Sequence, residues 1–203
     1  RDSAARGGKM TADRPLWITH LPEYAAEAFG LGLFMLAACG FGVLLFHPAS
    51  PAVSALPSVL LRSLLMGLAM GLTAIINIYS PWGRRSGAHL NPSVTLTFFR
   101  LGKVAGGDVL GYILAQFVGG FAGTGLSVLL FRRWIGDPSV NYVATVPGPA
   151  GLTVAFVAEL GISFFLMLVV LTVASRPRLA RFTGLFAGAL VALYITFEAP
   201  ISG

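Results

Sequence analysis

Five long apolar stretches constrain this chain more than any other feature, because each is close to the length needed to cross a bilayer. They lie approximately at residues 24–46, 58–79, 108–131, 152–174 and 179–197. A membrane-spanning helix needs about 20 mostly apolar residues. Charged residues make up only 11% of the 203 residues, too few to cover a surface that faces water. We therefore expect an all-α membrane protein whose main partner is the lipid bilayer, and no nucleic-acid partner.

The basic residues are unevenly distributed around these stretches. If the spans alternate in direction, Arg62, Arg132 and Arg133 lie on one side of the membrane and the remaining Lys and Arg residues on the other. The larger group comprises Arg1, Arg6, Lys9, Arg14, Arg84, Arg85, Arg100, Lys103, Arg176, Arg178 and Arg181. Basic residues collect on the cytoplasmic side of membrane proteins. The pattern predicts a cytoplasmic N-terminus, in a plasma (inner) membrane.

The segment 86–101 is too apolar for an ordinary loop and too short for a span. It contains Asn91 followed by Pro92, a pair typical of a helix start, because Asn caps the helix and Pro fits its first position. A helix over 92–101 would be about 15 Å long, half of a hydrocarbon core of roughly 30 Å. We expect it to begin near the membrane midplane and return to the cytoplasm. The alternative is an amphipathic helix lying on the membrane surface.

A re-entrant helix of this kind has a chemical consequence. Residues 87–90 must enter the membrane as non-helical chain, which is tolerated only inside protein or along a water-filled cavity. The N-terminus of the short helix adds a partial positive charge at the same depth. Channels that pass neutral solutes and repel cations use both features. The segment therefore predicts a polar path through the helix bundle, past Asn91.

Two glutamates indicate an internal repeat. Glu27 begins the first apolar stretch and Glu159 the fourth, and paired glycines recur in the same order after each of them. Because three spans make up the first copy, the second copy starts on the opposite side of the membrane, and the repeat is inverted. An inverted repeat places a solute path between the halves. We expect a cytoplasmic tail over 1–20, a first repeat over 21–135, an extracellular connection over 136–150 and an incomplete second repeat over 151–203.

The glycines make two further predictions. Pairs spaced four residues apart allow close helix packing in lipid, and they occur at Gly67/Gly71, Gly119/Gly123 and Gly184/Gly188. In the repeat, Gly203 corresponds to Gly87. A second re-entrant turn and another span should follow Gly203, so we expect the chain to be a truncated copy of a longer protein.

Residues 86–95 read Ser-Gly-Ala-His-Leu-Asn-Pro-Ser-Val-Thr. They resemble the first signature box of the major intrinsic protein family, the aquaporins and glycerol facilitators, in which alanine replaces the second serine. The resemblance covers about residues 20–203 and indicates a bacterial-type member. It implies the aquaporin-like fold and a homotetramer with one pore per subunit. Such a protein is a passive channel for water and/or small uncharged solutes such as glycerol, with no catalytic residue, cofactor or metal.

The resemblance also implies roles for the residues of the box. Asn91 would donate its side-chain amide to the solute, and Pro92 would start the half-helix. Backbone carbonyls would accept hydrogen bonds from the solute at Gly87, Ala88 and His89. The side chain of His89 has two equally favoured positions, facing the pore or packed beneath the loop.

Three other residues bear on selectivity. Ser93 stands where the box has alanine, and its hydroxyl could bond first-turn amides or a pore water, although a neutral exchange is favoured. Met70 and Ile195 fall near positions where family members narrow the outer pore. An apolar ring there, without histidine, would admit solutes as large as glycerol. Ordinary helix packing explains Met70 and Ile195 equally well.

Ionisable groups inside spans indicate function by default. The resemblance favours a supporting role for Glu27 and Glu159, in which each carboxylate accepts hydrogen bonds from re-entrant backbone. The alternative is a proton relay, which would make the protein a proton-coupled transporter. The missing second box leaves a further alternative, a non-conducting truncated channel or assembly subunit.

Overall fold

The computed structural model describes residues 16–202, and in that range the chain is helical without strands. The helices are α1 (Leu16–Thr19), α2 (Leu21–Phe46), α3 (Pro51–Ala55), α4 (Val59–Tyr79), α5 (Pro81–Ser86), α6 (Pro92–Arg100), α7 (Gly106–Phe131), α8 (Leu152–Ala174) and α9 (Thr183–Ser202). Short 3₁₀ turns lie at η1 (Arg132–Trp134), η2 (Asn141–Val143) and η3 (Ala180–Phe182). The predicted all-α fold is confirmed.

The long helices match the predicted spans. Within the described residues, five helices are long and apolar enough to cross a membrane. The bounds of α8 agree with the prediction, whereas α9 begins after a 3₁₀ turn and continues five residues beyond Phe197. Gly203, the predicted counterpart of Gly87, lies outside the described residues.

The short helices follow from local capping signals. Ser50, Ser58 and Ser80 precede α3, α4 and α5, and each side-chain oxygen accepts a hydrogen bond from a first-turn amide. Proline follows Ser50 and Ser80 at the first helical position, where its missing N–H costs nothing. Asn91 and Pro92 start α6 in the same way.

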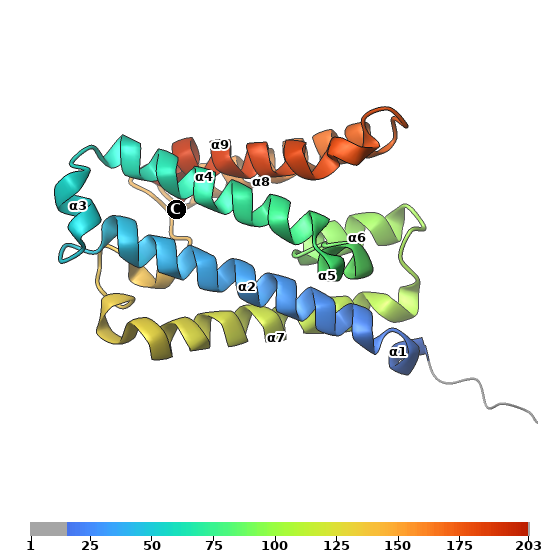
Figure 1. Cartoon of the computed structure of the whole chain (residues 1–203). Coiled ribbons are helices and arrows are strands. Elements are labelled where there is room, and N and C mark those ends of the chain that lie inside the picture. Colours follow the sequence, from blue (N-terminus) through green and yellow to red (C-terminus); the bar gives the residue numbers. More distant parts are fainter. Residues whose placement is uncertain (1–15, 203) are drawn as a thin grey trace, which may run out of the picture.

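Small residues bring the long helices together in pairs (Figure 1). A side chain at Gly119 or Gly123 of α7 would collide with the backbone of α2 at Ala28 or Gly32. A Cβ at Gly71 of α4 would likewise lie 2.5 Å from the carbonyl oxygen of Gly188 in α9. The predicted close packing through glycine pairs is therefore present in both helix pairs.

The bundle has two ends, which we name after residues at the two ends of α2. The His20 end holds α1 and the starts of α2 and α7, and the His47 end holds α3 and the connection from α7 to α8 (Figure 1). Basic residues of α5, α6 and the α8–α9 turn all lie at the His20 end.

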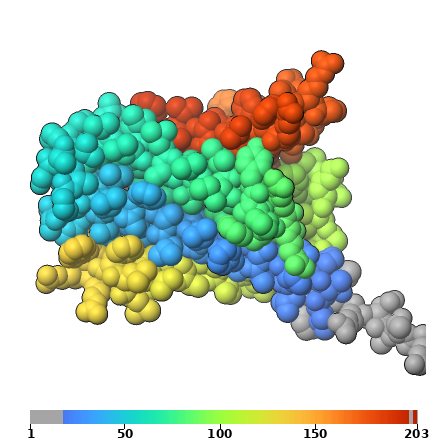
Figure 2. Space-filling view, in the orientation of Figure 1, coloured from blue at the N-terminus to red at the C-terminus, as the bar shows by residue number. Residues whose placement is uncertain are grey.

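Much of the outside of the bundle is apolar. Figure 2 shows α2 and α4 side by side over much of one face. Helix α8 packs mainly on α9 and buries only Ala155 and Val173. Large side chains such as Phe156, Phe164 and Phe165 are exposed along it. An apolar exterior of this extent suits lipid and not water.

Candidate functional site

The candidate site is the non-helical loop between α5 and α6. Helix α5 ends at Ser86 and is followed by Gly87, whose φ of +89° is a left-handed conformation that glycine adopts without steric cost. Ala88 and Leu90 also have positive φ values, of 47° and 54°. Strained backbone of this kind is retained where surrounding structure holds it, often at functional sites. The loop therefore depends on its supports.

Asn91 closes the loop and caps α6. Its Oδ1 accepts a hydrogen bond from the backbone N–H of Ser93 at 2.7 Å. The side-chain NH₂ group remains available as a donor, and Asn91 and Ser93 are both exposed. The Gly87, Ala88 and His89 carbonyls accept no hydrogen bond from any other residue in the range 16–202. Donor and acceptors thus occur together on one short segment.

Glu27 supports the loop from α2. Its side chain is completely buried, and Oε1 accepts hydrogen bonds from the Leu90 backbone N–H and from Gln116 Nε2, the latter at 2.8 Å. Gln116 of α7 also donates to Thr95 Oγ1 of α6 at 3.0 Å. These contacts fasten the loop and the first turn of α6 to the first third of α2 and to the middle of α7. The loop lies inside the bundle, so the amphipathic surface-helix alternative is not what the structure shows.

His89 packs beneath the loop. Its Nδ1 lies 3.1 Å from Thr95 Oγ1, and its ring stacks on Phe98 and Tyr112 with centroid distances of 5.1 and 4.8 Å. Of the two positions expected for this side chain, the structure adopts the packed one.

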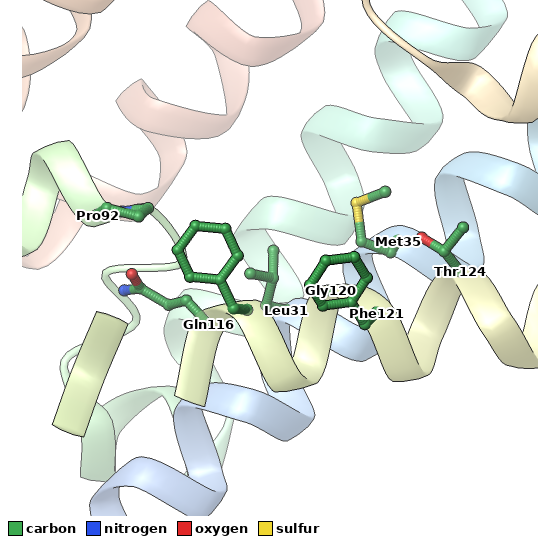
Figure 3. A pocket seen from close by; sticks show the side chains of 8 residues that line it. Leu31, Met35, Pro92, Gln116, Gly120, Phe121 and Thr124 are labelled. Atoms are coloured by element: carbon green, nitrogen blue, oxygen red, sulfur yellow. The ribbon is translucent and has the colours of Figure 1, made fainter. Parts of the chain in front are cut away.

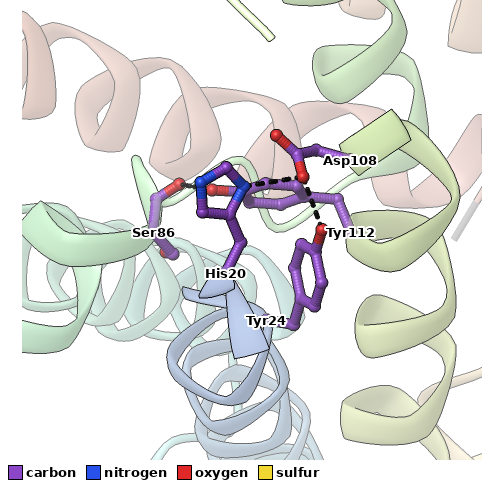
Figure 4. A network of polar contacts seen from close by, with 5 residues as sticks. All are labelled: His20, Tyr24, Ser86, Asp108 and Tyr112. Carbon is purple, nitrogen blue, oxygen red and sulfur yellow. Dashed lines mark hydrogen bonds and ion pairs between the residues drawn. The ribbon is translucent and has the colours of Figure 1, made fainter. Parts of the chain in front are cut away.

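A second set of polar contacts holds the loop at the His20 end (Figure 4). The Tyr112 hydroxyl donates to the Ser86 carbonyl at 2.7 Å, just before the loop begins. The Tyr112 ring meets Tyr24 edge-on, and the Tyr24 hydroxyl donates to Asp108 Oδ1 at 2.6 Å. His20 Nδ1 lies 2.7 Å from the same oxygen, and this hydrogen bond raises the pKa of His20 above its ordinary value. The network joins α2, α5 and α7.

Met70 and Ile195 come together away from the loop, toward the His47 end. Met70 is only 1% exposed and belongs to an apolar cluster with Ala38, Leu45 and Met66. Ile195 of α9 packs against this cluster, as does Val143 of η2. The two residues expected at an outer narrowing therefore share one apolar contact region between α2, α4 and α9.

Glu159 has a simpler environment than Glu27. It is partly buried in α8, and its Oε1 accepts a hydrogen bond from the Ser202 hydroxyl of α9 at 2.7 Å. In the sequence, Ser202-Gly203 repeats Ser86-Gly87, the start of the first loop. The carboxylate is thus bonded to the last described residue before the expected second turn.

Comparison with known proteins identifies the family. The Major intrinsic protein profile matches residues 17–203. The chain belongs to this family. A rice relative, "Aquaporin NIP1-4" from Oryza sativa subsp. japonica, is 32% identical over 198 residues, which cover 97% of this chain and 67% of the relative.

Two further relatives also align with this chain. "Aquaporin NIP1-1" of Zea mays is 28% identical over 92% of this chain and 61% of its own length. "Probable aquaporin AqpM" of Archaeoglobus fulgidus is 38% identical over 68% of this chain and 56% of its own length. The chain therefore spans about three fifths of the length of the maize relative.

The fold is also that of a solved major intrinsic protein. The X-ray structure of the aquaglyceroporin from Plasmodium falciparum superposes with a TM-score of 0.69 at 24% identity. The match covers 91% of this chain and 75% of that chain. Together with the apolar helices, this establishes an aquaporin-like integral membrane protein.

In this family member, the start of α6 opens onto an apolar groove of about 360 Å³ (Figure 3). Pro92 lies at one end of the groove, beside Leu31 of α2 and Gln116 of α7, and Phe121 and Thr124 line its continuation. Gln116 Oε1 is buried without a hydrogen-bond partner among the described residues. Since Leu31 and Gln116 lie near the middle of their helices, α6 begins at about half the depth of the bundle.

Four supports of the loop besides Glu27 were not predicted. Tyr24, Asp108, Tyr112 and Gln116 lie far from the loop in sequence, and only the fold brings them to it. For two of these residues, the sequence did indicate a contact inside the protein. Asp108 and Gln116 are polar residues in a predicted span, which by itself indicates a partner inside the protein.

Proposed function

We propose that this protein forms a passive transmembrane channel for water and/or small uncharged solutes such as glycerol. The observation that carries the proposal is the re-entrant loop that Glu27 holds, in which an exposed Asn91 and carbonyls without a hydrogen-bond partner among residues 16–202 occur on one segment. A solute with hydroxyl groups can replace its hydration with these donors and acceptors. The N-terminus of α6 adds a partial positive charge that opposes the passage of cations.

Each part of the site has a defined role in this proposal. Asn91 donates to the solute, the carbonyls of Gly87, Ala88 and His89 accept from it, and Pro92 fixes the start of α6. Ser93 is exposed two residues after Asn91, and its hydroxyl would bond a passing solute or water. Glu27 and Glu159 position re-entrant backbone, and Met70 with Ile195 forms the outer narrowing. The hydrogen bonds that Glu27 accepts support this role over proton relay.

The conducting unit would be larger than the described part of the chain. The relatives are longer, and the family resemblance places a second Asn-Pro turn and a sixth span in the remainder. The groove beside Pro92 and the unpartnered Gln116 Oε1 are suited to receive such a turn. We infer that the two repeats, 21–135 and 151–203, enclose the path between them.

The same proposal includes topology and assembly. The basic residues at the His20 end favour a cytoplasmic N-terminus in a plasma membrane. The exposed apolar length of α8 would contact lipid or a neighbouring subunit of a homotetramer.

The direct test is Asn91→Asp in protein expressed from its complete reading frame and reconstituted in liposomes. The change removes one donor, worth about 1.5 kcal/mol, which corresponds to roughly a tenfold loss of rate. Stopped-flow light scattering with sorbitol and then glycerol outside measures water and glycerol flux. Ser175→Asp, at an exposed residue directly after α8, adds the same charge away from the loop and should leave flux unchanged.

Two results would contradict the proposal. Unchanged flux in Asn91→Asp would remove the role given to that side chain. Uptake that follows a pH gradient and is lost in Glu27→Gln or Glu159→Gln would indicate a proton-coupled transporter instead.

A further inference from the structure

The connection from α7 to α8 contains an unusual turn. Asn141, Tyr142 and Val143 are consecutive non-glycine residues with φ values of 46°, 55° and 53°. Side chains make this left-handed region unfavourable, most of all for a β-branched residue such as valine. Such a turn persists only where its surroundings hold it.

Hydrogen bonds to the preceding turn hold this conformation in place. The Asn141 N–H donates to the Asp137 carbonyl at 2.7 Å, and the Tyr142 N–H donates to the Ile135 carbonyl at 2.8 Å. Ile135 is itself fully buried. The turn is therefore anchored to residues 135–137, directly after η1, by backbone hydrogen bonds.

As a result of this geometry, one side chain of the turn is partly buried against the bundle. Val143 packs against two apolar clusters, one around Met66 and Met70 and one around Cys39 and Val43. It approaches α2 so closely that a Cβ at Gly42 would lie 2.7 Å from Val143 Cγ2. The neighbouring Asn141 and Tyr142 remain exposed. The strained turn thus directs Val143, and not its two neighbours, onto α2 and onto the apolar cluster at the junction of α2 and α4, against which Ile195 of α9 also packs.

We propose that Val143 is a specificity-determining residue, which completes the outer narrowing with Met70 and Ile195 from the connection. This inference rests on the proposed channel function, which places that junction on the solute path. Val143 restricts the width of the path and offers no hydrogen bond to a passing hydroxyl group. A three-carbon polyol, being wider than water and richer in hydroxyl groups, is hindered more than water.

The test compares glycerol and water permeability in the same liposome assay. Val143→Gly removes the side chain and suits the left-handed φ, so the turn is retained while the path widens. We expect a several-fold rise in the ratio of glycerol to water permeability. Val143→Leu should lower the ratio. Val146→Ala, at an exposed valine of the same connection, is the matched control and should leave the ratio unchanged.

The permeabilities of these variants distinguish the role of Val143 from the channel function. If Asn91→Asp lowers flux but both Val143 variants behave like Val146→Ala, the Val143 role is overturned and the channel stands. Equal changes in water and glycerol permeability would also overturn it, because they would show a structural effect without selectivity. If Asn91→Asp leaves both fluxes unchanged, the channel function fails and the Val143 role fails with it.

Discussion

Glu27 and Glu159, which the proposed repeat pairs with each other, have different surroundings. Glu27 is completely buried and accepts hydrogen bonds from the re-entrant backbone and from Gln116. Glu159 is partly buried and accepts one, from the Ser202 hydroxyl. The same residue type therefore serves two environments, and the difference follows from the loop that is folded onto Glu27. A carboxylate inside an apolar helix is stabilised by the donors that converge on it, not by its place in the helix.

The largest expected effect comes from removing these carboxylates in turn. Glu27→Ala leaves the Leu90 N–H and one of the two Gln116 side-chain N–H groups without an acceptor, at about 1–3 kcal/mol each, while Gln116 keeps its bond to Thr95 Oγ1. Glu159→Ala removes one hydrogen bond from a partly exposed site, which should cost about 0.5–1.5 kcal/mol. Thermal and denaturant unfolding in detergent, followed by circular dichroism, measures both. If both variants lost the same free energy of unfolding, the hydrogen bond from the loop to Glu27 would contribute nothing to stability.

The spans and the start of α6 could be predicted from local sequence alone. The spans could be predicted because a bilayer sets the length and composition of any helix that crosses it. The start of α6 could be predicted because Asn91-Pro92 is a local signal, read without tertiary structure. Helix α5 carries an equally local signal in Ser80-Pro81, which the prediction passed over.

Contacts between distant segments could not be predicted in this way. Tyr24 and Asp108 are 84 residues apart, and Glu27 and Gln116 are 89 apart, so no local pattern relates them. Val143 is the clearest case of tertiary structure overriding local preference, since valine rarely adopts the left-handed conformation that packing imposes on it. The position of His89 was undecided for the same reason, because its stacking partner Tyr112 lies on another helix.

A smaller loss of stability is expected when a methyl group is added to glycines at helix contacts. These variants test whether helices from different halves pack as closely as helices within the first half. Gly119 contacts α2 inside the first half, whereas Gly71 contacts α9 across the two halves. Gly71→Ala and Gly119→Ala should each lower the free energy of unfolding by about 1–3 kcal/mol, because the added methyl group meets facing backbone. Gly161→Ala in α8 has open space around the new methyl group. It should be neutral or stabilising by about 0.5–1 kcal/mol. A loss for Gly119→Ala alone would mean that α4 and α9 are not in close contact.

The smallest expected effect concerns the support at the His20 end, where Asp108 receives hydrogen bonds from Tyr24 and His20. The hydrogen bond to Asp108 is the main cause of the raised pKa of His20, and the nearby Glu23 carboxylate acts in the same direction. Because the folded protein holds this proton more tightly than the unfolded chain, the added stability is fully present below the ordinary histidine pKa of about 6.5. It is lost as the pH rises through the raised value.

Melting curves across this pH range should show that wild type is more stable than His20→Gln at low pH, and that this difference fades as the pH rises. Asp108→Asn should remove the same pH dependence while Glu159→Gln retains it. An advantage of His20 that grows with pH would contradict the pairing and leave Tyr24 and Tyr112 as the supports of the loop at this end.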